Sequence, residues 1–394
     1  MTDLRLVASP SRRTSRTRAH TLRLLLGAGL LFGAASASAQ GALSTQGFGY
    51  PPGGLSARAL GTSGATGEFD LLSTLNPAAI NDVGSGVVTV QGQPETRTLR
   101  VGDLSERSRI QRIPMVGAGL RVRQLGFMIS ASTLLDRTFA TQSEGTAIVD
   151  GRTVPTVDDL EARGAITELR FGAGWSWRSL RLGAAAIAVT GDNTAVRART
   201  FPDSLGFGSV LDTASSGYQG FGASLGVNWR PLDGLLLAGS WRVGGRLEGV
   251  RGDSVLSRAS VPDRLGAGVL YDGLRGTVLA ASIERVGWSA MNGLGSDASQ
   301  ARDATNWSVG AEFVGGSLRA FPVLWRVGYA NRALPFSVGT AEVTERGLSA
   351  GLGLPIVGEQ GVVDVAVQRL QRRMTGDAAR EDAWALTVGL TIRP

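Results

Sequence analysis

The stretch TELRFGAGWSWR, residues 167–178, decides the fold class because its apolar residues occupy every second position. In a β-strand, successive side chains point to opposite faces of the sheet, so this stretch predicts a strand with one apolar face. The apolar face carries Leu169, Phe171, Ala173, Trp175 and Trp177, and the opposite face carries Glu168, Arg170, Gly172, Gly174, Ser176 and Arg178.

The same alternation recurs at 220–229, 307–313, 323–330 and 384–393. Short turns at 230–234 and 272–274 join such stretches in pairs, while longer polar stretches at 141–165, 191–217 and 287–305 separate the pairs. Alternating short and long connections are typical of outer-membrane β-barrels, and the pattern predicts about 14 antiparallel strands between residue 84 and the C-terminus. The strand count depends most on residues 84–101, where the alternation weakens.

A soluble β-sandwich or solenoid would also show alternation, so it is the competing architecture. Strands of about ten residues or more favour the barrel. So do tryptophans near the ends of several strands, because aromatic girdles form where a barrel meets the lipid–water boundary. We expect Trp177, Trp229, Trp288 and Trp384 at such boundaries.

The first 39 residues read as a secretory signal peptide. A basic segment ends at Arg23, an apolar run follows over 24–33, and Ala37-Ser38-Ala39 fits a small-residue cleavage site. The apolar run is shorter than the roughly 20 residues that a spanning helix needs. An uncleaved anchor helix is the alternative. The segment implies export, and with the barrel pattern it predicts the bacterial outer membrane.

Composition narrows the function. The chain of 394 residues contains 56 glycines and no cysteine, and its one histidine, His20, lies in the predicted signal peptide. Without His or Cys, the mature chain lacks the usual general base, thiol nucleophile and transition-metal ligands, so we expect no enzyme, metal site or cofactor. All 40 basic residues are arginine. Six of them and one acid precede Leu24, which leaves 34 basic against 32 acidic residues and argues against nucleic-acid binding.

Residues 40–83 precede the first expected strand and are rich in Gly, Ser, Ala and Pro without a sustained period. From these residues alone, two interpretations stay open: a disordered tail, or a compact plug inside the barrel lumen. Glycine suits a plug because it permits positive φ and close backbone approach. In the triplet Asn76-Pro77-Ala78, a turn role is favoured over ligand contact.

Four blocks of sequence resemble the FadL family of outer-membrane transporters for fatty acids and hydrocarbons. The first block is a Gly-rich run over 53–61 followed by Gly64-Ala65 and Asn76-Pro77-Ala78, which is similar to the family's N-terminal hatch. The others are 261–289, Arg326-Val327-Gly328-Tyr329 with Leu334-Pro335, and the strands over 347–354 and 362–370. PorV-like and PorQ-like barrels of a secretion apparatus share the first block.

The resemblance implies an outer-membrane channel for hydrophobic small molecules such as long-chain fatty acids or hydrocarbons, gated by a plug over 40–83 inside a barrel over 84–394. Capture is expected at outer loops such as 201–211. The alternative is an outer-membrane scaffold or shuttle of a secretion system, as PorV-like barrels are. Expected partners are the lipid bilayer, a hydrophobic ligand and, during biogenesis, the barrel-assembly machinery. The resemblance places the hatch at Gly53, Gly54, Arg58, Gly61, Gly64, Asn76, Pro77 and Ala78.

If the apolar faces meet lipid, the opposite faces line the interior. They carry charges of both signs, which are expected to form an ionic network that holds the plug in place. The arginine guanidinium suits this role because it can donate two parallel hydrogen bonds to one carboxylate. Arg326 meeting a substrate carboxylate is the functional alternative, and an internal salt bridge is favoured because charges inside barrels are commonly paired. The predicted lumen residues are Arg121, Glu168, Arg170, Arg242, Glu284, Glu312, Arg326 and Asp364.

Overall fold

The computed structural model describes residues 43–46, 48–149, 151–201, 208–294, 299–318, 321–338, 341–356, 360–376 and 379–393. The predicted signal peptide and residues 202–207 of the predicted capture loop lie outside the described residues. Among the described residues, no helix is long and apolar enough to cross a membrane.

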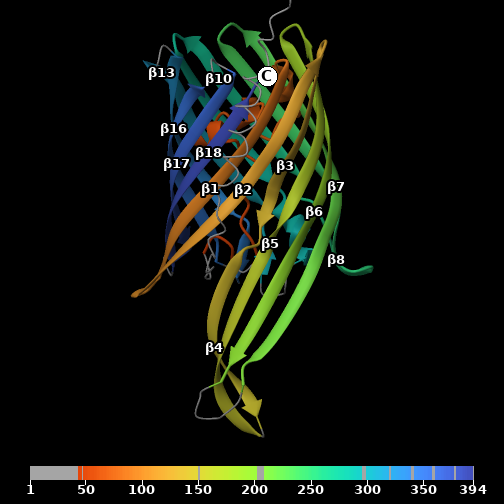
Figure 1. The fold of residues 1–394 in the computed structure, drawn as a ribbon, viewed down its shortest axis with the longest axis vertical. Helices are drawn as coiled ribbons and strands as arrows, with labels where there is room; N and C mark the ends of the chain where they lie inside the picture. The colour runs from red at the N-terminus through yellow and green to blue at the C-terminus, as the bar shows by residue number, and fades with distance from the viewer. Residues whose placement is uncertain are drawn as a thin grey trace, which may run out of the picture. The chain divides into compact units, whose positions relative to one another are not determined.

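The described strands form one antiparallel sheet of 16 strands that closes on itself through the β8–β10 and β1–β18 pairings (Figure 1). Two of its strands, β4 and β9, each pair with a single neighbouring strand and lie outside the closed ring. The described ring therefore has 14 strands, which confirms the predicted barrel. The ring consists of β1 Gly86–Val101, β2 Leu104–Val122, β3 Leu125–Asp136, β5 Arg152–Trp177, β6 Leu180–Thr200, β7 Val210–Leu232, β8 Leu235–Arg251, β10 Arg264–Leu274, β11 Thr277–Val286, β13 Ala304–Leu318, β14 Phe321–Leu334, β16 Val343–Ile356, β17 Gly361–Met374 and β18 Arg380–Ile392.

The remaining elements are short. Strand β4 (Phe139–Val149) pairs with β5, β9 (Ser254–Ser260) pairs with β8, and β12 (Ser299–Ala301) pairs with β15 (Phe336–Val338). Before the barrel lie helix α2 (Ala57–Gly61) and the 3-10 helices η1 (Gly67–Phe69) and η2 (Pro77–Asp82). A further 3-10 helix, η4 (Trp288–Leu294), follows β11.

The alternation divides the wall into an apolar outer face and a polar inner face. Within the opening stretch, Phe171 is 58% exposed while Glu168 is 3% exposed. Trp177, Trp229 and Trp384 are exposed as predicted, but Trp288 is only 5% exposed and packs inside against Phe336. The boundary prediction for Trp288 was therefore wrong, because η4 folds into the barrel end instead of continuing a strand.

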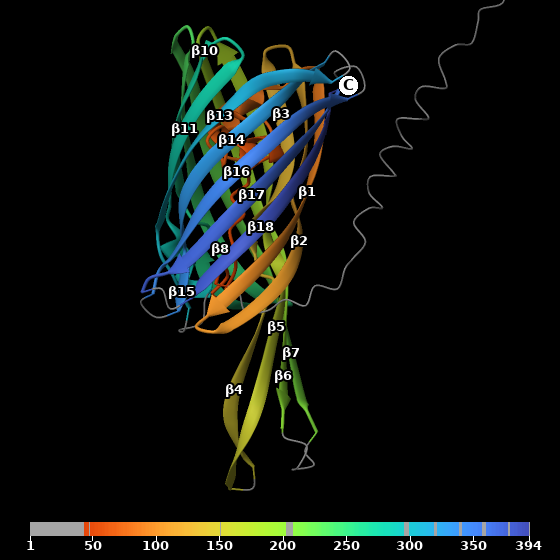
Figure 2. The ribbon, with the colours of Figure 1, turned by 90° about the vertical axis from the view of Figure 1, so that its left-hand side faces the viewer.

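The two ends of the barrel differ. Short turns join β2 to β3, β5 to β6, β7 to β8 and β10 to β11 at one end, while the longer connections lie at the other. From that second end, β4 and the outer parts of β5, β6 and β7 continue past the barrel as a projecting sheet (Figures 1 and 2). The polar stretches 141–165 and 191–217, predicted as loops, are therefore largely strands. Their alternation is weak because both faces of the projecting sheet meet water.

The wall is not continuous between β2 and β3. These strands pair only from Met115↔Ser132 to Val122↔Leu125. Beyond Met115, β2 keeps its partner β1, and β3 keeps its partner β5. Within the described residues, the outer half of β2 thus has no strand partner on the β3 side.

Candidate functional site

Residues 48–83 pack against the inward faces of strands all around the ring, and the wall makes room for them with glycine. A Cβ atom at Gly183 of β6 would lie 2.2 Å from the carbonyl carbon of Pro77, and one at Gly226 of β7 would lie 1.9 Å from Asn76 Oδ1. On the opposite side, a Cβ at Gly328 of β14 would lie 2.2 Å from the carbonyl carbon of Thr62. Much of the glycine content is thus a packing requirement.

The Asn76-Pro77-Ala78 triplet starts η2 and attaches it to the wall. Asn76 is the N-cap residue, with its Oδ1 accepting from the Ala78 amide at 2.9 Å, and Pro77 occupies the first turn, where its missing N–H costs nothing. Asn76 Nδ2 also donates to Asn228 Oδ1 of β7 at 2.8 Å. Both the oxygen and the nitrogen of the Asn76 side-chain amide are therefore hydrogen-bonded.

The other predicted hatch residues cluster around α2. Gly53, Gly54 and Gly64 have φ of +93°, +62° and +92°, a region that side chains rarely adopt. Gly61 lies against the wall, where a Cβ would come within 3.0 Å of Arg326 Cδ. Arg58 Nη2 reaches Glu312 Oε1 of β13 at 2.9 Å.

Three of the predicted lumen charges meet next to α2, where Gly61 lies against the Arg326 side chain. Arg326 of β14 is 2% exposed and donates through Nε to Glu312 Oε2 at 2.6 Å and through Nη1 to Asp364 Oδ1 of β17 at 2.7 Å. Arg58 is the second cation on Glu312. Arg326 is thereby enclosed by protein carboxylates, the arrangement of an internal salt bridge.

The other predicted charges form a second cluster. Glu168 accepts from Arg170 at 3.0 Å and from Arg242 of β8 at 2.6 Å. Glu284 of β11 accepts from Arg264 at 2.6 Å, and Arg264 also pairs with Glu68 of η1. Arg121 instead donates to backbone carbonyls, with Nε 2.9 Å from the carbonyl oxygen of Val83.

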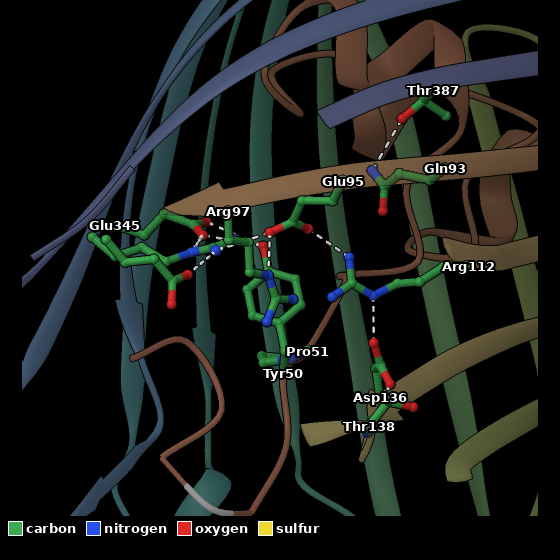
Figure 3. Close-up of polar contacts among 12 residues, drawn as sticks. Tyr50, Pro51, Gln93, Glu95, Arg97, Arg112, Asp136, Thr138, Glu345 and Thr387 are labelled. Atoms are coloured by element: carbon green, nitrogen blue, oxygen red, sulfur yellow. Dashed lines mark hydrogen bonds and ion pairs between the residues drawn. The ribbon is translucent and has the colours of Figure 1, made fainter. Parts of the chain in front are cut away.

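A third cluster, which the sequence analysis did not predict, surrounds Tyr50 (Figure 3). Arg372 of β17 pairs with Glu95 of β1 at 2.9 Å and with Glu345 of β16 at 2.7 Å. The Tyr50 ring lies between guanidinium groups, 4.8 Å from Arg372 Cζ. Four arginines approach this ring within cation–π range: Arg97, Arg112, Arg332 and Arg372.

Tyr50 also joins the third cluster to the break in the wall. Its amide and carbonyl pair with Asp136 at the end of β3, both at 2.8 Å. Asp136 in turn accepts from Arg112 of β2. An ion pair therefore crosses between β2 and β3 where their backbone pairing has stopped.

The signal for the third cluster was present in the sequence. Glu95 and Arg97 continue the inward register of Thr89 and Gln91. The outward positions between them, Gly92, Pro94 and Thr96, are less apolar than Val88 and Val90, so the alternation weakens there and hides that register.

An apolar cluster fills the interior at the end that carries the long connections. Phe48 and Phe336 contact each other there with ring centroids 4.5 Å apart, and Trp288 packs on Phe336 at 5.9 Å. The cluster consists of Phe48, Leu134, Leu135, Ile166, Ile187, Val189, Tyr218, Leu247, Val261, Val286, Trp288, Met291, Ala301, Ala304 and Phe336. An apolar interior is unusual in a water-filled porin, whose lumen is polar.

A cleft connects this apolar cluster with the second charged cluster. It encloses about 570 Å³, including solvent-open space. Its apolar side is formed by Leu134, Val286 and Trp288, and its charged side includes Glu168 and Arg242. The cleft is thus amphipathic, with an aromatic ring at one side and paired ions at the other.

No protein-family model matches the sequence, and no curated protein matches it. Among solved structures, a Pseudomonas aeruginosa FadL homologue covers 87% of this chain and 99% of its own, with a TM-score of 0.60 and 12% identity. The Ralstonia pickettii toluene transporter TbuX covers 86% and 98%, with a TM-score of 0.56 and 15% identity. The CymD monoaromatic hydrocarbon channel covers the same shares, with a TM-score of 0.55 and 13% identity. The chain therefore has the fold of the FadL-type channels.

Proposed function

We propose that this protein is a bacterial outer-membrane channel for hydrophobic small molecules, such as monoaromatic hydrocarbons or fatty acids, and that residues 48–83 form a plug in its lumen. The observation that carries the proposal is the apolar cluster around Trp288 and Phe336 inside the barrel, opening into an amphipathic cleft. A solute leaving water would gain burial against these side chains. The toluene and hydrocarbon channels that share the fold support the same class of solute.

The N-terminal segment is bonded to several different strands of the wall, and these contacts support its role as a plug. Asn76 is bonded to β7, Arg58 is paired with β13, and Glu68 is paired with Arg264 of β10. Each bond holds a different point of the segment. A segment anchored in this way obstructs the lumen, and solute passage requires it to shift or the solute to leave through the wall.

The break between β2 and β3 is the wall opening that we propose for exit. Outside the break, Ile113 of β2 is 64% exposed, so a hydrophobic solute leaving there meets apolar surface. Inside it, Ser132 and Leu134 of β3 line the cleft. The Arg112–Asp136 ion pair is then the contact that spans the exit.

Uptake measurements on two tryptophan variants test the channel. Trp288→Gln removes an aromatic side chain from the interior cluster, whereas Trp241→Gln removes one that is 51% exposed on the outer face. An aromatic contact is worth about 0.5–1.5 kcal/mol beyond its buried area, so Trp288→Gln should raise the half-saturating toluene concentration roughly twofold to twelvefold. Cells expressing either variant are compared for labelled toluene uptake. Equal uptake by the two variants contradicts the proposed path.

The projecting sheet favours a second candidate, an envelope scaffold of the PorV-like kind. Its outer strands β4 and β7 leave edges that are unpaired among the described residues, and such edges accept a strand from another protein. Shortening the β4–β5 and β6–β7 hairpins to the barrel rim should leave toluene uptake intact if the protein is a channel. Loss of a co-purifying envelope protein with unchanged uptake in both tryptophan variants would favour the scaffold.

A further inference from the structure

Arg137 lies in the two-residue connection between β3 and β4, at the end of the barrel that carries the long connections. Its backbone amide donates to the carbonyl oxygen of Gly164 in β5 at 3.0 Å, so the wall holds the main chain there. Its guanidinium lies against two rings of the interior apolar cluster, with Cζ 4.5 Å from the centre of the Phe48 ring and 5.4 Å from that of Tyr218. A charged group is thus fixed at the edge of an apolar cluster.

The hydrogen bonds of the Arg137 guanidinium leave one of its edges without a partner. Nη1 donates to the hydroxyl of Tyr218. Nε and Nη2, whose N–H groups point the same way, have no hydrogen-bond acceptor among the described residues, and Nε is buried. The side chain as a whole is half-buried, so a molecule arriving at this end of the barrel reaches it at the border of the cluster.

The charge of Arg137 also has no carboxylate partner in the described part of the chain. The arginines of the three charged clusters differ, because each of them is paired with a glutamate or an aspartate. A buried charge is costly unless it is paired, and the two rings offset only part of that cost. A water molecule on Nε would complete the hydrogen bonding and still leave the charge uncompensated.

A row of aromatic rings leads from this guanidinium to the amphipathic cleft. Phe48 contacts Phe336 with ring centroids 4.5 Å apart, and Phe336 contacts Trp288 with centroids 5.9 Å apart. Trp288 lines the cleft together with Leu134, which precedes Arg137 by three residues at the end of β3. The three rings and Leu134 belong to one buried cluster. A solute with an acid group on Arg137 would therefore have aromatic rings beside its apolar body.

We propose that Arg137 binds the carboxylate of an aromatic acid at the mouth of the barrel, with the ring of the acid against the row that begins at Phe48. Two parallel N–H groups of a guanidinium match the two oxygens of a carboxylate, and the edge formed by Nε and Nη2 is the one available. The acid supplies the missing counter-charge. An aromatic body is favoured over an aliphatic one because ring pairs gain energy beyond the area that they bury. This inference rests on the proposed channel function and names one class of its solutes.

The test measures binding of tritiated 4-propylbenzoate to the full-length protein in lipid nanodiscs by scintillation proximity. Arg137→Gln should weaken binding roughly tenfold to 150-fold, which is the usual contribution of hydrogen bonds to a charged group. Arg137→Lys keeps the charge but loses the parallel donors, so its loss should be smaller. The control Arg178→Gln removes a guanidinium that lies 5.2 Å from the Trp177 ring at the opposite end of the barrel, and it should bind like wild type. Heat-dependent gel mobility checks that every variant is a folded barrel.

Unlabelled competitors separate the two halves of the ligand. The neutral 4-propyltoluene should displace the label roughly tenfold less well than unlabelled 4-propylbenzoate, because it lacks the acid group. The acid 4-propylcyclohexanecarboxylate has the same charge and carbon number without an aromatic ring, and it should compete roughly twofold to twelvefold less well. Equal competition by the cyclohexane acid contradicts an aromatic ligand, and acetate that displaces the label at the same concentration as 4-propylbenzoate means that the site takes any small anion.

Two further outcomes overturn the assignment of Arg137. Equal binding by wild type and Arg137→Gln means that the guanidinium does not hold the carboxylate. An equal loss in Arg178→Gln means that the attraction is only that of net charge. Failure of the acid site is distinguishable from failure of the channel. Wild type that does not bind 4-propylbenzoate, while toluene uptake still differs between Trp288→Gln and Trp241→Gln, rejects the acid site alone, whereas equal toluene uptake by those two variants rejects the channel.

Discussion

The substitution Gly183→Ala tests whether the N-terminal segment fills the lumen. Its Cβ would lie 2.2 Å from both the carbonyl carbon and oxygen of Pro77, whereas ordinary contacts begin at 3.4 Å, so η2 must retreat by at least 1.2 Å. The obstructing atoms are backbone, so no side-chain rotation relieves the clash. Overpacking of this kind typically costs about 1–3 kcal/mol, which corresponds to roughly fivefold to 150-fold greater population of a displaced segment.

Two measurements follow the displacement. Trypsin cleavage after Arg58, which lies in the segment, should accelerate by a similar factor, and conductance across a planar bilayer should rise as the lumen opens. The matched control is Gly239→Ala in β8, whose Cβ would meet Val227 Cγ1 at an ordinary 3.4 Å. Both variants must show the gel mobility of a folded barrel. If a folded Gly183→Ala variant equals Gly239→Ala in cleavage and conductance, the glycine positions do not make room for a plug.

Three further changes have expected outcomes. Arg326→Met leaves two carboxylates buried without their shared cation, and urea unfolding in lipid vesicles should show a loss of about 3–5 kcal/mol. Asn76→Ala removes the N-cap of η2, typically about 1 kcal/mol, and should increase trypsin cleavage of the segment several-fold while leaving the barrel's gel mobility unchanged. In the projecting sheet, hydrogen bonds from Arg199 and then Arg197 hold the pKa of Asp158 below its usual range. Its stabilisation is therefore present above the unfolded pKa of about 3.9 and is lost as pH falls through the lower folded value, so hydrogen exchange of wild type and Asp158→Asn should differ at pH 7 and converge in strong acid.

Alternation along the strands was enough to predict the barrel and its strand number, because a wall between oil and a polar interior imposes a period of two. The prediction was weakest at β1, where Gly92, Pro94 and Thr96 take the outward positions that valine occupies earlier in the strand. It failed in the projecting sheet, because strands with water on both faces carry no apolar period. It failed again at Trp288, because an aromatic residue serves a lipid boundary or a lumen equally well and only the path of η4 decides which.

For the candidate site, the sequence predicted which charged residues face the lumen but not which of them pair with each other. The inward register of single strands identified Glu168, Arg170 and Arg326 as lumen charges. Which charge meets which depends on the closure of the ring and on residues 48–83, whose lack of a period gives no register. Glu68 and Tyr50 belong to that segment, so their places in the ionic clusters could not be read from alternation.

The contacts of the N-terminal segment restrict the order in which the chain can be assembled. Helix η2 touches β5, β6 and β7, while α2 touches β16, β17 and β18. The β1–β18 pairing then joins the first and last strands of the ring. Once that seam is shut, α2 and η2 would have to enter through one end of the ring and reach their positions past the side chains that line it. We therefore expect the segment to be wrapped by the growing sheet, and the last hairpin to be the step that encloses it.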